Sequence, residues 1–166
     1  MTTGTLHAKR LSTYLNDHLA AATGGVELAK RARGSNEGTP YGELLARLER
    51  ELEEDRQALM DVMGRLAVDR NQLKVGAGWL AEKVGRLKIN DQITGYSPLS
   101  RVVELEGLQL LVAGNRALWA TLADVAAGRP EVEPVDFTGA VARAEAQLAA
   151  IEPLRAQAAR EALAGE

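Results

Sequence analysis

Apolar side chains recur at alternating intervals of three and four residues along this sequence, and that spacing constrains the fold more than any other feature. Intervals of three and four residues follow one face of an α-helix, so each stretch predicts an amphipathic helix that must bury its apolar face. The clearest stripe is Leu45, Leu48, Leu52, Asp55, Leu59, Val62 and Leu66. We therefore expect an all-α protein whose helices pack side by side along their lengths.

Capping residues, prolines and glycines set the expected helix boundaries. Thr39-Pro40 and Ser97-Pro98 are typical helix starts, because a hydroxyl caps the free backbone N–H groups and proline suits the first turn. A proline inside a helix removes a hydrogen bond, so Pro153 is expected to kink or interrupt the last helix. The predicted helices are, in order, 6–33, 40–66, 73–89, 98–127 and 136–164.

Short connections between these segments predict antiparallel neighbours within one domain over 1–166. We expect an up-and-down antiparallel four-helix bundle over 6–127, a linker over 128–135 and an additional C-terminal helix over 136–164. This last helix must either cover one side of the bundle or pair with a second copy. A homodimer through the C-terminal helix is therefore one of the expected assemblies.

Composition excludes several classes of protein. The chain has 166 residues, which suffices for a continuous core, and it contains no cysteine, which rules out disulfides and thiolate chemistry. We find no secretory pattern at the start and no apolar run that could span a membrane, and we expect a cytoplasmic protein. A formal net charge of −3 does not favour nucleic acid as a partner, although the predicted third helix and its flanks carry a local excess of basic residues that could face an anion.

Four polar side chains interrupt the apolar stripes: His18, Asp55, Glu104 and Asn115. A titratable group among leucines is costly to bury without a partner. If facing residues in the first helical hairpin have numbers that sum to about 74, His18 lies beside Asp55. The same step through the predicted third helix brings Glu104 to that level. We therefore expect a buried polar layer at mid-height in the bundle.

Two interpretations of this layer remain open at this stage. The first is a structural network of hydrogen bonds, joined by Arg101, that fixes the register of the helices. The second is a mononuclear site for a divalent transition metal, with His18, Asp55 and Glu104 as ligands. We favour the structural network, because buried polar groups usually satisfy one another.

With an inward polar level among antiparallel helices, residues 6–127 resemble the ferritin-like four-helix bundles, and the layout is similar to that of a bacterial family of helical proteins. Members of the ferritin-like group with a di-iron centre carry two Glu-x-x-His motifs and two further glutamates. This sequence has two histidines, His7 and His18, and no Glu-x-x-His motif, so we expect neither a di-iron centre nor an enzyme. The expected function is that of a non-enzymatic structural or protein-interaction bundle; the alternative is a ferritin-like mononuclear metal-binding protein.

Overall fold

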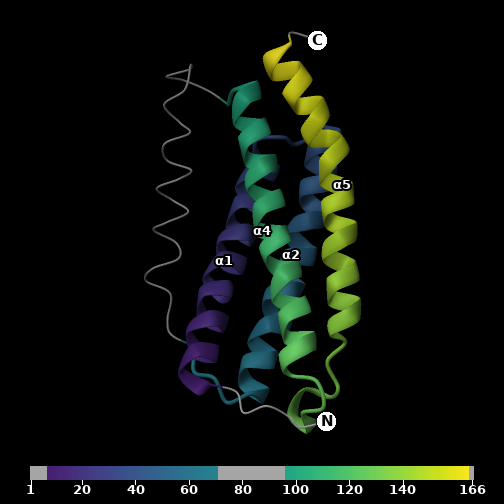
Figure 1. Ribbon diagram of the computed structural model, residues 1–166. Helices are drawn as coiled ribbons and strands as arrows, with labels where there is room; N and C mark the ends of the chain where they lie inside the picture. Colours follow the sequence, from purple (N-terminus) through teal and green to yellow (C-terminus); the bar gives the residue numbers. More distant parts are fainter. Residues whose placement is uncertain (1–6, 71–95, 165–166) are drawn as a thin grey trace.

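The computed structural model describes residues 7–70 and 96–164, and these ranges form four α-helices and no strand (Figure 1). The helices are α1 (Ala8–Gly34), α2 (Pro40–Arg65), α4 (Pro98–Val125) and α5 (Phe137–Leu163), with a short 3₁₀ helix, η1 (Pro130–Val132), before α5. The predicted all-α class is confirmed for the described residues. The helix predicted over 73–89 lies outside them.

The expected helix starts are confirmed by their capping hydrogen bonds. The Thr39 hydroxyl accepts a hydrogen bond from the backbone N–H of Gly42 at 3.2 Å, and the Ser97 hydroxyl accepts one from Ser100 at 3.2 Å. Pro153 was expected to kink or interrupt the last helix. Helix α5 runs without a break through this residue, so it is not interrupted there. Figure 1 shows that the last part of α5 changes direction and leans over the end of the bundle.

The four helices pack as two antiparallel hairpins, α1 with α2 and α4 with α5. Helix α1 also lies against α4, and α2 lies against α5, so the four helices close into a ring around one core. The C-terminal helix is thus one of the four described members of the bundle. Its inner face is buried at Ala140, Ala144, Ile151 and Ala158. That this helix is additional to a four-helix bundle over 6–127, and that it forms a homodimer, remain predictions.

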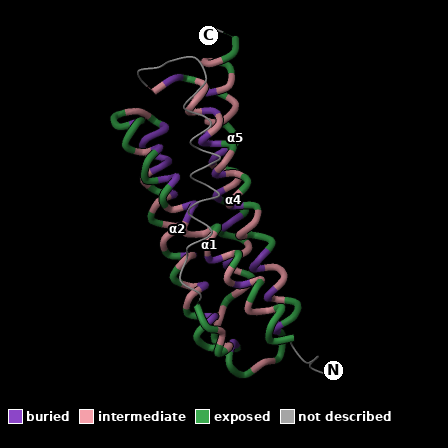
Figure 2. The backbone as a smooth tube through the Cα atoms, turned by 90° about the vertical axis from the view of Figure 1, so that its left-hand side faces the viewer, coloured by how far each residue is buried: buried purple, intermediate pink, exposed green. Residues whose placement is uncertain are grey.

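The core contains two apolar clusters, one toward each end of the bundle. Figure 2 shows buried residues along the length of the bundle. Leu48 and Leu108 belong to the first cluster, and Leu59 and Trp119 belong to the second. Each fully buried side chain of this size stabilises the fold by roughly 2 kcal/mol relative to an exposed one. Asp55 and Asn115 lie between the clusters in the sequences of α2 and α4, which places a polar level at mid-height.

Within the described ranges, no helix has the length and apolar character needed to cross a membrane.

Candidate functional site

Asp55 is the centre of a buried hydrogen-bond network at mid-height, and its side chain is only 2% exposed. One carboxylate oxygen accepts two hydrogen bonds from the guanidinium of Arg143, at 2.9 and 3.2 Å. The other accepts from the side-chain amides of Asn115 and Gln147, each at 3.2 Å. We call these four residues the Asp55 network; it joins α2 to both α4 and α5.

This network leaves the Asp55 carboxylate with no spare capacity for chemistry. Four accepted hydrogen bonds fill the sites that two carboxylate oxygens offer. A buried charge is tolerated when it is both paired and hydrogen-bonded, which the Arg143 fork and the two amides achieve together. The geometry is that of a structural tie between three helices.

His18 lies about one helical turn away from this level and has a different environment. Its ring is half-buried and contacts the ring of Tyr14 edge-on, with centroids 4.5 Å apart. Burial lowers the pKa of His18 below 6.5, and the nearby charge of Asp17 opposes this shift. His18 and Asp55 line the same cavity, but the hydrogen-bond partners of Asp55 come from α4 and α5.

The predicted register of α1 against α2 differs from the structure by about one turn. A Cβ atom added at Gly25 would lie 3.9 Å from Leu52 Cδ1, whereas the expected register puts residue 49 opposite Gly25. The level of Asp55 is therefore occupied on α1 by residues near Ala22, one turn beyond His18. Small side chains at this level leave a cavity where a histidine partner was expected.

Glu104 belongs to a second network at the end of the bundle where α1 finishes and α4 begins. Its carboxylate accepts hydrogen bonds from the Tyr96 hydroxyl at 2.9 Å and from Arg31 at 3.2 Å. Asn36 donates to the Tyr96 hydroxyl at 2.8 Å and accepts from Arg101 at 2.7 Å. We call this group, with Glu161, which pairs with Arg101 at 3.0 Å, the Glu104 network.

The Glu104 network keeps the carboxyl group of Glu104 largely out of contact with solvent. Glu104 is 8% exposed, and burial raises its pKa above 4.5, although the hydrogen bond from Tyr96 and the charge of Arg31 oppose the shift. Burial also raises the pKa of Tyr96, and the charge of Glu104 adds to this effect. Arg101 covers the Tyr41 ring, with its guanidinium carbon 4.4 Å from the ring centroid. These contacts join the ends of α1, α4 and α5.

The structure does not bring the expected layer together. Asn115 does contact Asp55, but Glu104 precedes Asn115 by eleven residues on α4, which is about 16 Å along a helix. Among the described residues, no group of three or more histidine, aspartate and glutamate side chains is placed to hold a metal ion. The proposed ligands His18, Asp55 and Glu104 are therefore not positioned as one metal site.

One part of the Asp55 network carries a sequence signal that the stripe analysis missed, whereas two residues of the Glu104 network carry none. Arg143 and Gln147 are four residues apart on α5, and Gln147 continues the buried stripe of Ala140 and Ala144. The partner of Asp55 was therefore readable as the one polar residue in that stripe. Tyr96 and Asn36 lie in connections next to the helices, where helical spacing gives no signal.

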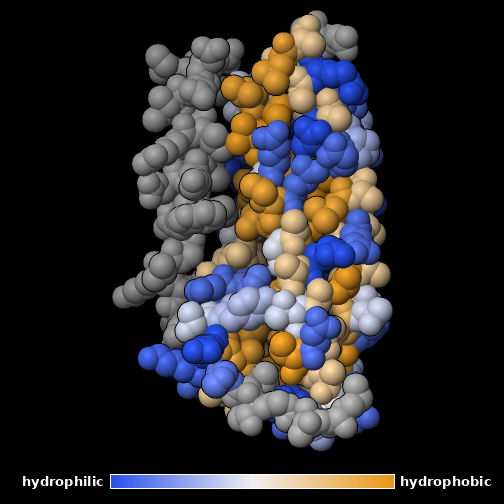
Figure 3. Space-filling model, viewed as in Figure 1, coloured by the Kyte–Doolittle hydropathy of each residue, from blue (hydrophilic) through white to orange (hydrophobic). Residues whose placement is uncertain are grey.

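A cavity of about 100 Å³ with mainly apolar walls lies between α1 and α4, and Leu52 and Asp55 of α2 also line it. We define the α1–α4 groove by the residues that line this cavity from these two helices: His18, Ala21, Ala22, Gly25, Leu110, Leu111, Gly114 and Asn115. Leu110 is 76% exposed at the rim. Figure 3, in which α4 faces the viewer, shows apolar side chains interspersed with polar ones along this helix.

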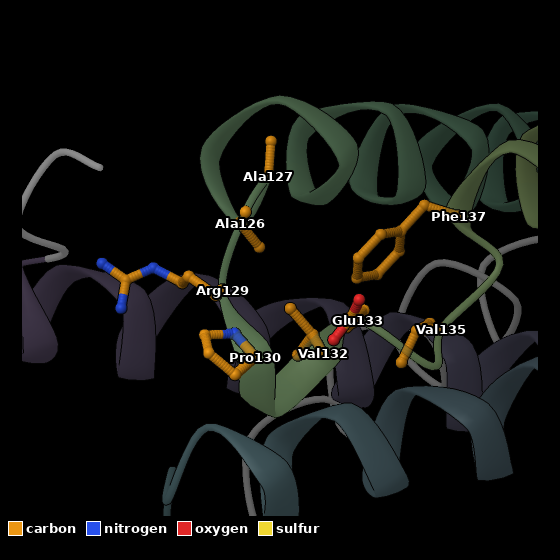
Figure 4. Close-up of a pocket in the computed structure, with 9 residues that line it drawn as sticks. Ala126, Ala127, Arg129, Pro130, Val132, Glu133, Val135 and Phe137 are labelled. Carbon is orange, nitrogen blue, oxygen red and sulfur yellow. The ribbon is translucent and has the colours of Figure 1, made fainter. Parts of the chain in front are cut away.

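A second hollow, of about 360 Å³, lies at the connection between α4 and α5 (Figure 4). Residues of this connection and the first residue of α5 form it; Phe137 and Glu133 project toward the same space, while Arg129 points away. The linker expected over 128–135 thus contains η1, and its Val132 is buried in the core. This hollow brings no set of reactive groups together.

Comparisons with protein-family models, with curated proteins and with solved structures find no match to this chain.

Proposed function

We propose that the protein is a non-enzymatic helical bundle that acts through protein contact, and that its α1–α4 groove binds an amphipathic helix. The observation that carries this proposal is the exposure of Leu110 in the middle of a regular helix, above a cavity with mainly apolar walls. An exposed apolar side chain beside an apolar hollow offers a contact surface to a partner. Helices that bind in grooves insert apolar side chains at intervals of three and four residues.

The small residues of α1 support a helix as the bound element. Ala21, Ala22 and Gly25 have little or no side chain, so a helix lying over them can approach closely. The polar groups beneath them are already engaged, since Asn115 donates to Asp55. The groove therefore offers shape and apolar surface rather than reactive groups.

A photo-crosslinking amino acid at position 110 tests this function in cells that produce the full chain. Leu163 is the matched control, because it is 73% exposed but lies at the end of α5, outside the groove. We expect a defined crosslinked peptide at position 110 whose apolar residues follow helical spacing, and no such product at position 163. Identical products at both positions, or no product at position 110, would overturn the proposal.

A further inference from the structure

The backbone around the hollow between α4 and α5 is fixed in place by contacts on several sides. Gly128 has a positive φ of 74°, which suits glycine, and η1 follows it. Val132 is 2% exposed and belongs to the second core cluster, and its carbonyl accepts a hydrogen bond from the N–H of Val135 at 2.9 Å. Arg65 of α2 donates to the backbone oxygen of Glu131 at 3.4 Å. The hollow is therefore preformed, as sites for small molecules usually are.

Two side chains of different chemistry project into this hollow, the Phe137 ring and the Glu133 carboxylate (Figure 4). The Phe137 ring also contacts the buried ring of Trp119, with centroids 6.3 Å apart, so its position is supported from the core. In the described part of the chain, no side chain forms an ion pair or a hydrogen bond with the Glu133 carboxylate. A negative charge and an aromatic ring thus face the same space without a cation between them.

The charges around the hollow are mainly negative. Asp124, Glu131 and Asp136 lie in the same stretch of sequence, and the basic residue there, Arg129, points away from the hollow. Helix α4 ends at the hollow, and the C-terminal end of a helix carries a partial negative charge. The N-terminal end of α5 is already capped, because Asp136 accepts a hydrogen bond from the N–H of Gly139 at 2.8 Å. The local field therefore favours a cation.

The walls of the hollow select a weakly hydrated cation. Apart from Glu133, the side chains around it are mainly apolar: Ala126, Ala127, Pro130, Val132 and Val135. A metal ion needs several oxygen ligands, and among the described residues no group of three or more histidine, aspartate and glutamate side chains could hold one. A primary ammonium group is strongly hydrated and needs several acceptors. A trimethylammonium group needs none, and its methyl groups gain from contact with an aromatic face and apolar walls.

We propose that the hollow between α4 and α5 binds a trimethylammonium group, with its charge beside the Glu133 carboxylate and its methyl groups against the Phe137 ring. The volume of about 360 Å³ lies in the range of small-molecule sites. This inference goes beyond the proposed function, because none of the residues that line the hollow belongs to the α1–α4 groove. The same chemical group occurs in free choline-like compounds and on trimethylated lysine.

A titration of the full chain with choline, followed by backbone amide NMR at constant ionic strength, tests the proposal. Two ligand controls are matched to choline: dimethylbutanol, the neutral analogue in which carbon replaces nitrogen, and ethanolamine, which lacks the methyl groups. Two variants change the site, Glu133→Gln and Phe137→Leu. Glu131→Gln is the control variant, because Glu131 lies in η1 but does not line the hollow. Circular dichroism confirms that each variant is folded.

We expect choline to shift the amide signals of residues that line the hollow, such as Gly128 and Val135, and to bind more tightly than either control ligand. Glu133→Gln and Phe137→Leu should each weaken choline binding by about two- to fivefold, the range for an exposed charge pair and a cation–π contact. Glu131→Gln should change it less. Equal binding of the neutral analogue, shifts confined to other regions, or unchanged affinity in either site variant would overturn the inference.

A short peptide with one trimethyllysine distinguishes the two sources of the group. Tighter binding of this peptide than of choline assigns the hollow to a methylated protein, whereas tighter binding of choline assigns it to a free small molecule. In both cases Glu133→Gln and Phe137→Leu should weaken the binding. Peptide and choline binding that is unaffected by these substitutions would contradict the site.

Discussion

Helix α4 packs against α5 on one side and against α1 on the other, and the side chains that cross these two contacts differ in polarity. Toward α5, polar side chains cross the rim: Gln109 donates to Glu152 at 2.7 Å, and Arg116 pairs with Glu145 at 2.7 Å. Toward α1, the middle of the rim is Leu110, and small residues lie beneath it. Arg31 of α1 forms an ion pair with Glu104 of α4, but this contact lies near the end of the helices.

This difference indicates that the α4–α5 contact is complete within the bundle, whereas the α1–α4 groove leaves apolar surface uncovered. Polar crossings on the α5 side satisfy side chains at fixed heights, and the Asp55 network lies beneath them, so this seam specifies the register of α4 against α5. The α1 side offers apolar surface and a cavity, which gain free energy only when another apolar element covers them. Contact with a further helix is therefore expected on the α1 side.

The largest change in the free energy of unfolding is expected when the Asp55 network, beneath the α4–α5 contact, is removed. Asp55→Ala leaves the buried amide of Gln147 without its acceptor and Arg143 without its counter-charge, and we expect a loss of about 3 kcal/mol in the free energy of unfolding. Urea unfolding followed by circular dichroism measures this loss.

The rim of the same seam provides the control. Glu145→Ala removes an ion pair in which both side chains are about half exposed, so the expected loss is under about 0.5 kcal/mol. If Asp55→Ala costs no more than Glu145→Ala, the α5 side is not held by its buried network.

A smaller change in the free energy of unfolding, this time a stabilisation, is expected from a substitution in the α1–α4 groove. Gly25→Ala adds a Cβ atom at ordinary contact distance, 3.7 Å from Leu111 Cδ1, and it should stabilise α1 by about 0.5–1 kcal/mol through helix propensity. Gly107→Ala, across the same interface, places its Cβ atom 3.1 Å from Leu28 Cδ2 and should gain less. Thermal unfolding measures the melting temperatures of both variants. A lower melting temperature for Gly25→Ala than for the parent chain would show that position 25 has no space for a Cβ atom.

The smallest effect concerns the dependence of stability on pH. Burial raises the pKa of Glu104, so the folded state binds this proton more tightly than the unfolded state. The contribution of Glu104 to the free energy of unfolding is therefore highest below pH 4.5 and falls as the pH rises through the raised pKa. Glu104→Gln should remove this fall, and urea unfolding between pH 4 and about 7 should show the difference. Parallel pH profiles for the two proteins would argue against a buried, poorly hydrated carboxyl group.

The helices themselves were predictable from the sequence because their signals are local. Thr39 with Pro40 and Ser97 with Pro98 cap helices where expected, and the stripe through Asp55 is buried as its spacing predicts. Of the two effects expected at Pro153, a kink or an interruption, the interruption is absent, because α5 continues through this residue. Local spacing thus predicts which residues form helices and which faces point inward.

The candidate sites were less predictable, because contacts between helices depend on neighbours and register. Asp55 was correctly expected to need a buried partner, yet that partner came from α5, which the sequence pattern placed outside the bundle. Helix α1 contacts α4 directly, so a register counted through a third helix put Glu104 at the wrong height. An error of one turn is enough to replace a histidine with alanine at the level of Asp55.

The most direct test of the central claim, that the α1–α4 groove is covered in the full chain, compares two leucines of nearly equal exposure in the described structure. Leu110 is 76% exposed and Leu163 is 73% exposed, so each is replaced by glutamate and unfolded in urea. If a helix covers the groove, Leu110→Glu lowers the free energy of unfolding by about 1–2 kcal/mol more than Leu163→Glu, because only the first buries a charge. Equal free energies for the two variants would contradict the claim and leave Leu110 in solvent.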